Sequence, residues 1–202
     1  MWITLRNGKK FSIENIMSFK NLELKISYDS DEMNILDAFY RPVLQESILY
    51  QRMAGYFSST TFGLVMGEVM DFIEKGGRIK LVTGVELSEN DKDVIEEYVN
   101  GRTAKFNDHL IKEIDTANMF LTDCSALMGW MLVKKIDGES QLEIKIAIPE
   151  EDGKVGSRLY HQKVGVFFDS DGDVVSFEGS VNETGRAWTN NIESFKPSIS
   201  WG

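Results

Sequence analysis

The sequence predicts an α/β protein with a mixed, largely parallel central sheet flanked by helices. A strand-like run at 48–57, a helical run at 62–77 that ends in two glycines, and a second strand-like run at 78–84 follow one another directly. This succession is a β-α-β unit, and its two strands are expected to lie parallel. An apolar run at 142–149 and a strand-turn-strand pattern at 160–179 supply further strands.

The remaining elements extend this pattern on both sides. Alternating apolar and polar residues at 22–28 predict a half-buried strand, and the spacing of apolar residues at 33–44 predicts a helix that Pro42 should end or bend. The stretch from 87 to 135 is mostly helical in pattern. Its apolar end, FLTDCSALMGWMLVKK, predicts a core helix.

Length and composition limit the number of domains that the chain can form. The chain has 202 residues and 42% hydrophobic content, which is enough for one well-filled core. Neither an internal repeat nor a low-complexity linker divides it. We therefore expect one domain over 1–202, with its core at about 22–200.

The charge and cysteine content narrow the function classes. A formal net charge of −10 argues against a protein that coats DNA, but a locally positive cleft can still receive a phosphate chain. The single cysteine, Cys124, leaves no disulfide to form within the chain and is expected to fill the core. Without a signal-like or membrane-spanning apolar run, the sequence predicts a cytoplasmic protein with no membrane contact.

The segment that carries chemistry is YHQKVGVFFDSDGDVVSFEGSVNETGRAWTNNIESF. His161 and Lys163 lie two apart on a predicted strand, so both side chains leave the same face. The turn at 170–173 should return the chain alongside that strand. Ser180 and Asn182 then lie near the end of the returning strand, where they can face the same cleft.

This order of residues resembles the signature of the phospholipase D superfamily. The matching residues are His161 and Lys163, then Asp169, then Gly179, Ser180 and Asn182, and last Glu193. The chain is most similar to bacterial members with a single copy of the motif, which are found in metal-independent nucleases, restriction enzymes and the N-terminal domains of defence-related helicases. The segments AGYFSS, GGRIKLVTG and LEIKIAIP also look like that group.

The resemblance implies hydrolysis of a phosphodiester through a covalent intermediate on histidine. A neutral imidazole at His161 would attack phosphorus, and water would then release the phosphate. Lys163, Ser180 and Asn182 would donate hydrogen bonds to the nonbridging oxygens and replace the charge that a metal otherwise supplies. Glu193 would hold the other ring nitrogen of a histidine.

Four further residues are candidates for contact with the substrate. Ser58 and Ser59 follow a strand at the edge where open α/β sheets place ligands, and Gly179 adjoins Ser180. Asp169 comes one residue later than the common pattern has it, which would turn it to the opposite strand face, so we also expect it to stabilise the turn.

No metal or cofactor is predicted. The acidic turn Asp169-Ser-Asp-Gly-Asp173 matches part of a calcium-binding loop but lacks the glutamate that such a loop needs at its twelfth position. The sequence also lacks a Cys/His cluster with the spacing of a zinc site.

The implied chemistry needs a second histidine to protonate the leaving oxygen. The only other histidine, His109, lies in a polar helical pattern without His-x-Lys spacing, although it could serve as the acid within one chain. Two identical chains that meet across a twofold axis would supply both histidines, so we expect a homodimer with one shared site.

Nucleic acid, specifically DNA, is the substrate that the resemblance favours. A phospholipid phosphodiesterase and a non-catalytic module that binds DNA or a partner protein stay open as alternatives. The candidates for a positive surface are Arg41, Arg52, Lys154, Arg158 and Arg186. The chain stops directly after an apparent strand, so we expect a longer natural chain in which a helicase or specificity domain follows.

Overall fold

The computed structural model describes residues 2–4, 10–12, 18–84, 121–136, 138–147, 150–151, 154–155 and 160–201. The predicted helical region at 87–120, with His109, lies outside the described residues, as does Arg158. None of the helices described is long and apolar enough to cross a membrane.

The described part of the chain alternates strands and helices. The helices are the 3-10 helix η1 (Phe19–Asn21), the π-helix η2 (Leu36–Tyr40), α1 (Arg41–Glu46), α2 (Thr60–Leu64), α3 (Met66–Glu74), α6 (Leu121–Val133) and α7 (Gly185–Thr189). The strands are β1 (Trp2–Thr4), β2 (Lys10–Ser12), β3 (Tyr28–Asp29), β4 (Leu49–Ala54), β5 (Arg78–Thr83), β6 (Lys135–Ile136), β7 (Glu139–Ser140), β8 (Leu142–Ile146), β9 (Glu150–Glu151), β10 (Lys154–Val155), β11 (Val164–Phe168), β12 (Val174–Gly179) and β13 (Ser194–Ile199).

Seven of these strands form one mixed sheet in the order β3-β13-β12-β11-β4-β5-β8. The predicted α/β class, a mixed sheet flanked by helices, is confirmed. The expectation that the sheet would be largely parallel needs correction, because only the β4–β5 and β5–β8 pairings are parallel. The other four pairings are antiparallel, since the late hairpin β11–β12 inserts beside β4 and β13 continues from it.

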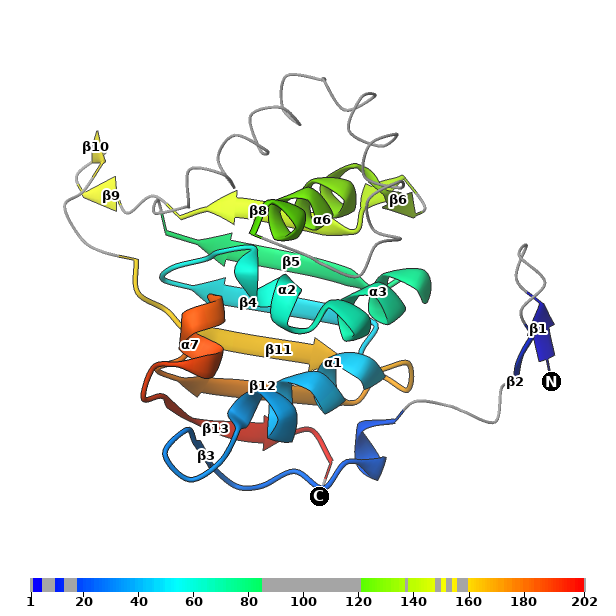
Figure 1. The fold of residues 1–202 in the computed structure, drawn as a ribbon, viewed down its shortest axis with the longest axis horizontal. Helices are drawn as coiled ribbons and strands as arrows, with labels where there is room; N and C mark the ends of the chain where they lie inside the picture. The colour runs from blue at the N-terminus through cyan, green and yellow to red at the C-terminus, as the bar shows by residue number, and fades with distance from the viewer. Residues whose placement is uncertain are drawn as a thin grey trace.

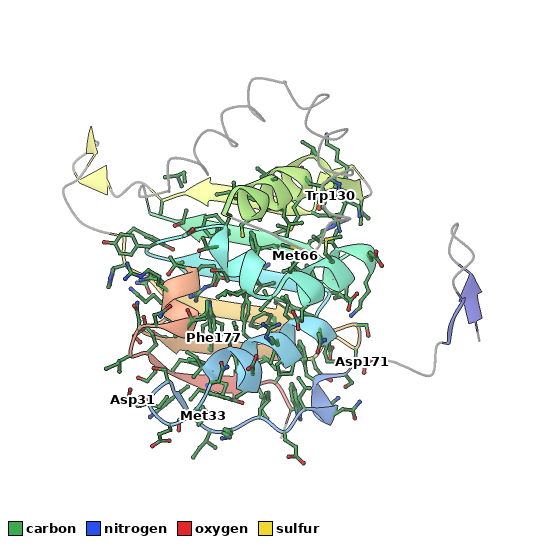
Figure 2. The ribbon with its side chains drawn as sticks, viewed as in Figure 1. Asp31, Met33, Met66, Trp130, Asp171 and Phe177 are labelled. Atoms are coloured by element: carbon green, nitrogen blue, oxygen red, sulfur yellow. The ribbon has the colours of Figure 1, made fainter. Side chains whose placement is uncertain are left out.

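The helices of the described chain cover one face of this sheet. In Figure 1, α1, α2, α3, α6 and α7 all lie in front of the strands. Alternation along the strands matches this placement: in β4, Tyr50, Arg52 and Ala54 are buried, whereas Leu49, Gln51 and Met53 are less so. An aromatic cluster fills the space beneath α1 and α7, and Figure 2 shows Phe177 within it.

The predicted β-α-β unit is confirmed, with a break in its helix. β4 and β5 are parallel neighbours, and Gly76 ends α3 in the left-handed conformation at φ 89°, which a glycine adopts without strain. The expected single helix at 62–77 is divided at Val65, where φ is −121° and ψ is 37°.

The N-terminal part of the sheet differs most from expectation. Of the strand predicted at 22–28, only Tyr28 pairs with a neighbour: it forms β3 together with Asp29 and pairs with β13. The helix predicted at 33–44 forms, but Pro42 does not end it. A π-helical turn at Leu36–Tyr40 precedes Pro42, which lies in the first turn of α1, where a missing backbone N–H costs least.

The late hairpin sets the position of the candidate site. β11 is the fourth of the seven strands, between β12 and β4. Its first residue, Val164, is paired with Met53 near the end of β4. The residues that precede β11 therefore lie in the middle of the sheet edge at which the parallel strands β4, β5 and β8 end, on the left in Figure 1.

Candidate active site at the central sheet edge

His161 and Lys163 contact each other directly. The Lys163 Nζ lies 2.9 Å from Nε2 of His161 and 3.3 Å from the His161 carbonyl oxygen. An ammonium group only donates, so the ring nitrogen accepts and the ring proton is then on Nδ1. His161 is exposed and Lys163 is 8% exposed, so the imidazole faces solvent with the ammonium behind it.

The environment of Lys163 makes its charge sensitive to its neighbours. Burial lowers the pKa of Lys163 from its ordinary value, the charge of Glu193 raises it, and that of Arg52 lowers it further. Both charges are therefore within electrostatic reach of the ammonium group. A cation that is only partly solvated interacts strongly with an anion that enters the site.

Asn182 lies close to His161 where both approach Gly55, and its amide has one assigned orientation. Its Oδ1 accepts a hydrogen bond from the Tyr56 backbone N–H at 3.1 Å. A backbone N–H needs an acceptor, so this contact assigns the oxygen to Tyr56 and leaves Nδ2 as a donor. Gly55 allows the close approach, because a Cβ there would lie 3.2 Å from His161 Cδ2 and 3.4 Å from Asn182 Oδ1.

Ser180 is exposed, and its hydroxyl is engaged with the backbone of Ser194. Its Oγ accepts from the Ser194 N–H at 3.0 Å and donates to the Ser194 carbonyl at 3.4 Å. Gly179 permits this contact between β12 and β13, since a Cβ there would lie only 2.2 Å from the Ser194 oxygen. The close approach of two strands accounts for Gly179 without any substrate.

Glu193 is buried beside the site rather than bonded to His161. Its Oε1 accepts from Asn191 Nδ2 at 3.1 Å, and its backbone N–H donates to Ser30 Oγ at 2.8 Å. Within the part of the chain that the structure describes, the carboxylate reaches Lys163 only through its charge. The role predicted for it, holding a ring nitrogen, stays a prediction.

Asp169 is not brought to this site. It follows β11, so the whole strand separates it from Lys163, and Figure 2 shows the same turn, labelled at Asp171, at the right-hand end of the hairpin. Its carboxylate accepts from the backbone N–H groups of Phe19, Asp171 and Asp173 at 3.0, 3.0 and 2.8 Å. These contacts stabilise the turn, and they leave no role for Asp169 in binding a substrate at His161.

The acidic turn itself is occupied by contacts of the chain. Ligand oxygens of Asp169, Asp171 and Asp173 lie within 4.8 Å of one another. Asp169 binds three backbone N–H groups, and Asp173 forms an ion pair with Lys20 at 2.7 Å. The contacts of Asp169 and Asp173 within the chain therefore account for both carboxylates without an ion.

The serines after β4 lie near the site without contacting its charged pair. The Ser58 N–H donates to the Glu183 carbonyl at 2.9 Å, and the Ser58 hydroxyl accepts from Thr60 Oγ1 at 3.0 Å. Ser59 is 2% exposed at the start of α2, so its side chain is not available at the surface. Contact of either serine with a substrate stays a prediction.

Two of the five cationic residues suggested for a positive surface form ion pairs or are buried. Arg41 forms ion pairs with Glu68 at 2.8 Å and with Asp37 at 2.7 Å. Arg52 is 1% exposed and lies inside the sheet's helical face. Arg186 is exposed on α7.

The residue that the sequence reasoning missed is Glu183, directly after Asn182. Its carboxylate is 2% exposed and binds Arg52 Nε at 2.8 Å, Tyr40 OH at 2.8 Å and Tyr50 OH at 2.9 Å. The available signal was Arg52 itself, a charged residue at an inward-facing position of an alternating strand, which requires a buried partner.

Two solved structures are similar to this fold. NucT from Helicobacter pylori is 11% identical over 85% of this chain and 82% of its own, with a TM-score of 0.48. The yeast tyrosyl-DNA phosphodiesterase is 8% identical over 77% of this chain, which spans about 26% of that enzyme, with a TM-score of 0.41. No protein-family model and no curated protein matches the sequence. Both TM-scores are low, so the function proposed below rests on the residues of this chain alone.

Proposed function

We propose that the chain is a metal-independent phosphodiesterase that cleaves DNA through a phosphohistidine at His161. The contact between His161 Nε2 and Lys163 Nζ, with Asn182 close to the same ring at Gly55, is the observation that carries the proposal. A nucleophile, a cation and an oriented amide donor at one exposed edge are the groups that attack at phosphorus requires.

In the free protein the ammonium of Lys163 occupies the lone pair of Nε2. A phosphate oxygen is a stronger acceptor for an ammonium than a neutral imidazole, because it is charged. When a phosphodiester binds, Lys163 therefore turns its hydrogen bond to a nonbridging oxygen and frees Nε2. Asn182 Nδ2 donates to the other nonbridging oxygen.

The bond changes then follow in two steps. The Nε2 lone pair forms a bond to phosphorus, the bond to the leaving oxygen breaks, and a second acid delivers a proton to that oxygen. In the second step water gives up a proton to the same group and attacks phosphorus, and His161 leaves with its lone pair restored. Both steps conserve charge and atoms without a metal ion.

We propose that the second acid is His161 of the partner subunit in a homodimer. His161 is exposed at the fourth of seven strands, in the middle of the sheet edge, where a twofold axis can bring two copies together. Sedimentation of the active protein should give a dimer. An active species that sediments only as a monomer would contradict this part of the proposal.

DNA is the proposed substrate, and the net charge of −10 then requires that binding depend on this local site rather than on the whole surface. We therefore expect weak, transient binding with turnover. A helicase or specificity domain in the same or another chain would supply the missing affinity.

The test compares wild type with His161→Ala, and uses Gln162→Ala as the matched control because Gln162 is the exposed neighbour. Plasmid DNA, short oligonucleotides and bis(p-nitrophenyl) phosphate are incubated with each protein in EDTA. Wild type and the control should cleave, and His161→Ala should lose at least about a thousandfold in rate. Wild type incubated with a phosphate-labelled oligonucleotide and quenched in alkaline detergent, which preserves the acid-labile bond between phosphorus and histidine, should carry the label on histidine.

Equal cleavage by wild type and His161→Ala eliminates the catalytic assignment. If none of the proteins cleaves but all of them shift DNA in a gel, the fold is a binding module instead. Cleavage of a phospholipid head group in vesicles without cleavage of DNA would move the proposal to a lipid substrate.

A further inference from the structure

A buried ion pair lies directly beneath the candidate site. Arg52 on β4 is 1% exposed and donates from Nε to Glu183 Oε2 at 2.8 Å. Tyr40 and Tyr50 donate their hydroxyls to the two oxygens of the same carboxylate at 2.8 and 2.9 Å. The guanidinium also lies over the Phe177 ring, 4.8 Å from its centroid. These contacts hold both side chains in place.

Arg52 forms hydrogen bonds with the residues on both sides of Asn182 in the chain. Its Nη2 donates to the carbonyl of Val181, the residue before Asn182, and its Nε binds the carboxylate of Glu183, the residue after it. A guanidinium presents its donors in a rigid planar fork. Arg52 therefore fixes the backbone at positions 181 and 183, and with it the direction in which Asn182 projects.

Glu183 also connects these contacts to the loop that contains Tyr56 and Ser58. Its N–H donates to the Tyr56 carbonyl at 3.2 Å, and its carbonyl accepts from the Ser58 N–H at 2.9 Å. These bonds form a parallel bridge between Phe57 and Glu183. The bridge places the Tyr56 N–H where it meets Asn182 Oδ1.

Stability alone is a weak reason for such a pair. A buried ion pair contributes little over apolar residues of the same volume, because desolvation offsets the attraction. Moreover, among the described residues Arg52 Nη1 is buried without a hydrogen-bond partner, which adds a cost. The pair therefore contributes mainly by fixing geometry. The charge of Arg52 also lies near enough to Lys163 to lower the pKa of that residue.

We propose that Arg52 and Glu183 are positioning residues that hold the Asn182 amide in its donor orientation beside His161, an inference that rests on the proposed phosphodiesterase activity. They do not touch the substrate. Their effect on the reaction passes through Asn182.

A double-mutant cycle tests this route. Arg52→Lys keeps the charge but loses the planar fork, and Glu183→Gln replaces one acceptor oxygen with a donor. Each is made in wild type and in Asn182→Ala, and kcat and KM are measured on bis(p-nitrophenyl) phosphate per folded molecule. In wild type, each should lower kcat by about 10-fold to 100-fold. In Asn182→Ala, the same change should cost less than about twofold, because the group that it positions is gone.

Gln141→Met is the matched control. Gln141 is 0% exposed and donates to the carbonyls of Ile73 and Gly77 near the start of β8, at the opposite end of the sheet. Its replacement also leaves buried polar groups unpaired, so it should lower stability. It should leave kcat per folded molecule unchanged in both backgrounds. Equal losses for Gln141→Met and Arg52→Lys would overturn the proposal, as would equal losses for Arg52→Lys with and without Asn182.

A readout without turnover separates this proposal from the proposed activity. The side-chain amide of Asn182 is assigned in a ¹⁵N spectrum from the signal that Asn182→Ala removes. Arg52→Lys should shift or broaden that signal, and Gln141→Met should not. If wild type cleaves no phosphodiester, the proposed function fails and this spectrum still decides whether Arg52 positions Asn182; an unchanged signal in Arg52→Lys would refute it.

Discussion

The two ends of strand β11 are both rich in polar side chains, but they use them differently. At the end where the strand begins, Lys163 contacts the exposed ring of His161, and the nearby Asn182 keeps its Nδ2 as a donor. After it, the Asp169 carboxylate binds three backbone N–H groups and is 1% exposed. Spare donors at an exposed site are available to a ligand, whereas groups that are paired and buried hold the chain in place.

This contrast separates residues that stand together in one sequence motif. His161, Lys163 and Asp169 lie within nine positions of the chain. Strand β11 nevertheless separates them, so that His161 and Lys163 lie at one end of the strand and Asp169 lies at the other. Substitutions at the first end should change the reaction and leave stability nearly intact. Substitutions at the second end should do the reverse.

The largest expected effect is on catalysis at the first end. Lys163→Ala removes a cation from the site and should lower kcat/KM by about 10²-fold to 10³-fold. Lys20→Ala, which removes the ion pair with Asp173 at the other end, is the control and should keep wild-type rates. Initial rates on a labelled oligonucleotide measure both. Similar losses of kcat/KM in the two variants would contradict the assignment of different roles to the two ends of β11.

The next effect is on stability at the second end. Asp169→Ala leaves the buried N–H group of Phe19 and the partly buried N–H groups of Asp171 and Asp173 without their acceptor and should lower the free energy of unfolding by about 2–4 kcal/mol. Denaturant titration measures the change. Activity per folded molecule should stay at the wild-type value, and a selective loss of kcat in fully folded Asp169→Ala would return this residue to the site.

A smaller effect concerns the alkaline limb of the pH profile. Lys163 must be protonated to donate, so activity falls as pH rises through its pKa, which burial lowers and the charge of Glu193 raises. Glu193→Gln removes the attraction that raises the pKa. The alkaline limb of kcat/KM should therefore move to lower pH, while Asp171→Asn at the other end should leave it in place. A shift to higher pH would contradict the electrostatic assignment.

The smallest effect is expected at Ser180. Its hydroxyl already exchanges two hydrogen bonds with the backbone of Ser194, so it has less to offer a phosphate than Lys163 or Asn182. Ser180→Ala should lower kcat/KM by less than about tenfold. Rates on the same oligonucleotide test it, and a loss equal to that of Lys163→Ala would show that Ser180 is a principal donor.

Much of the fold was predictable because its signals are local. The hairpin register follows from the turn at Ser170–Asp173 and from the alternation of residues in β11 and β12, and the β-α-β unit follows from adjacent segments. The order of the strands was not predictable in this way. The pairing of β11 with β4 depends on contacts between segments far apart in sequence, and these made the sheet mostly antiparallel.

The site, like the fold, was predictable where its signals are local and not where they depend on residues far apart in sequence. The spacing of His161 and Lys163 predicted that both leave one face, and they lie in contact. The Arg52–Glu183 pair joins residues 131 positions apart, so no spacing rule could pair them. Gly179 was read as part of the site, but its requirement comes from the approach of β13, a neighbour that the motif does not describe.

The insertion of β11 beside β4 also determines when the site can exist during protein synthesis. Arg52 of β4 leaves the ribosome 131 residues before its partner Glu183, a delay of about 7–26 seconds at about 5–20 residues per second. Until then Arg52 lacks the buried carboxylate that it pairs with. The orientation of Asn182, and with it the proposed site, is therefore set only after Glu183 has left the ribosome, although the strand that carries Arg52 is made much earlier.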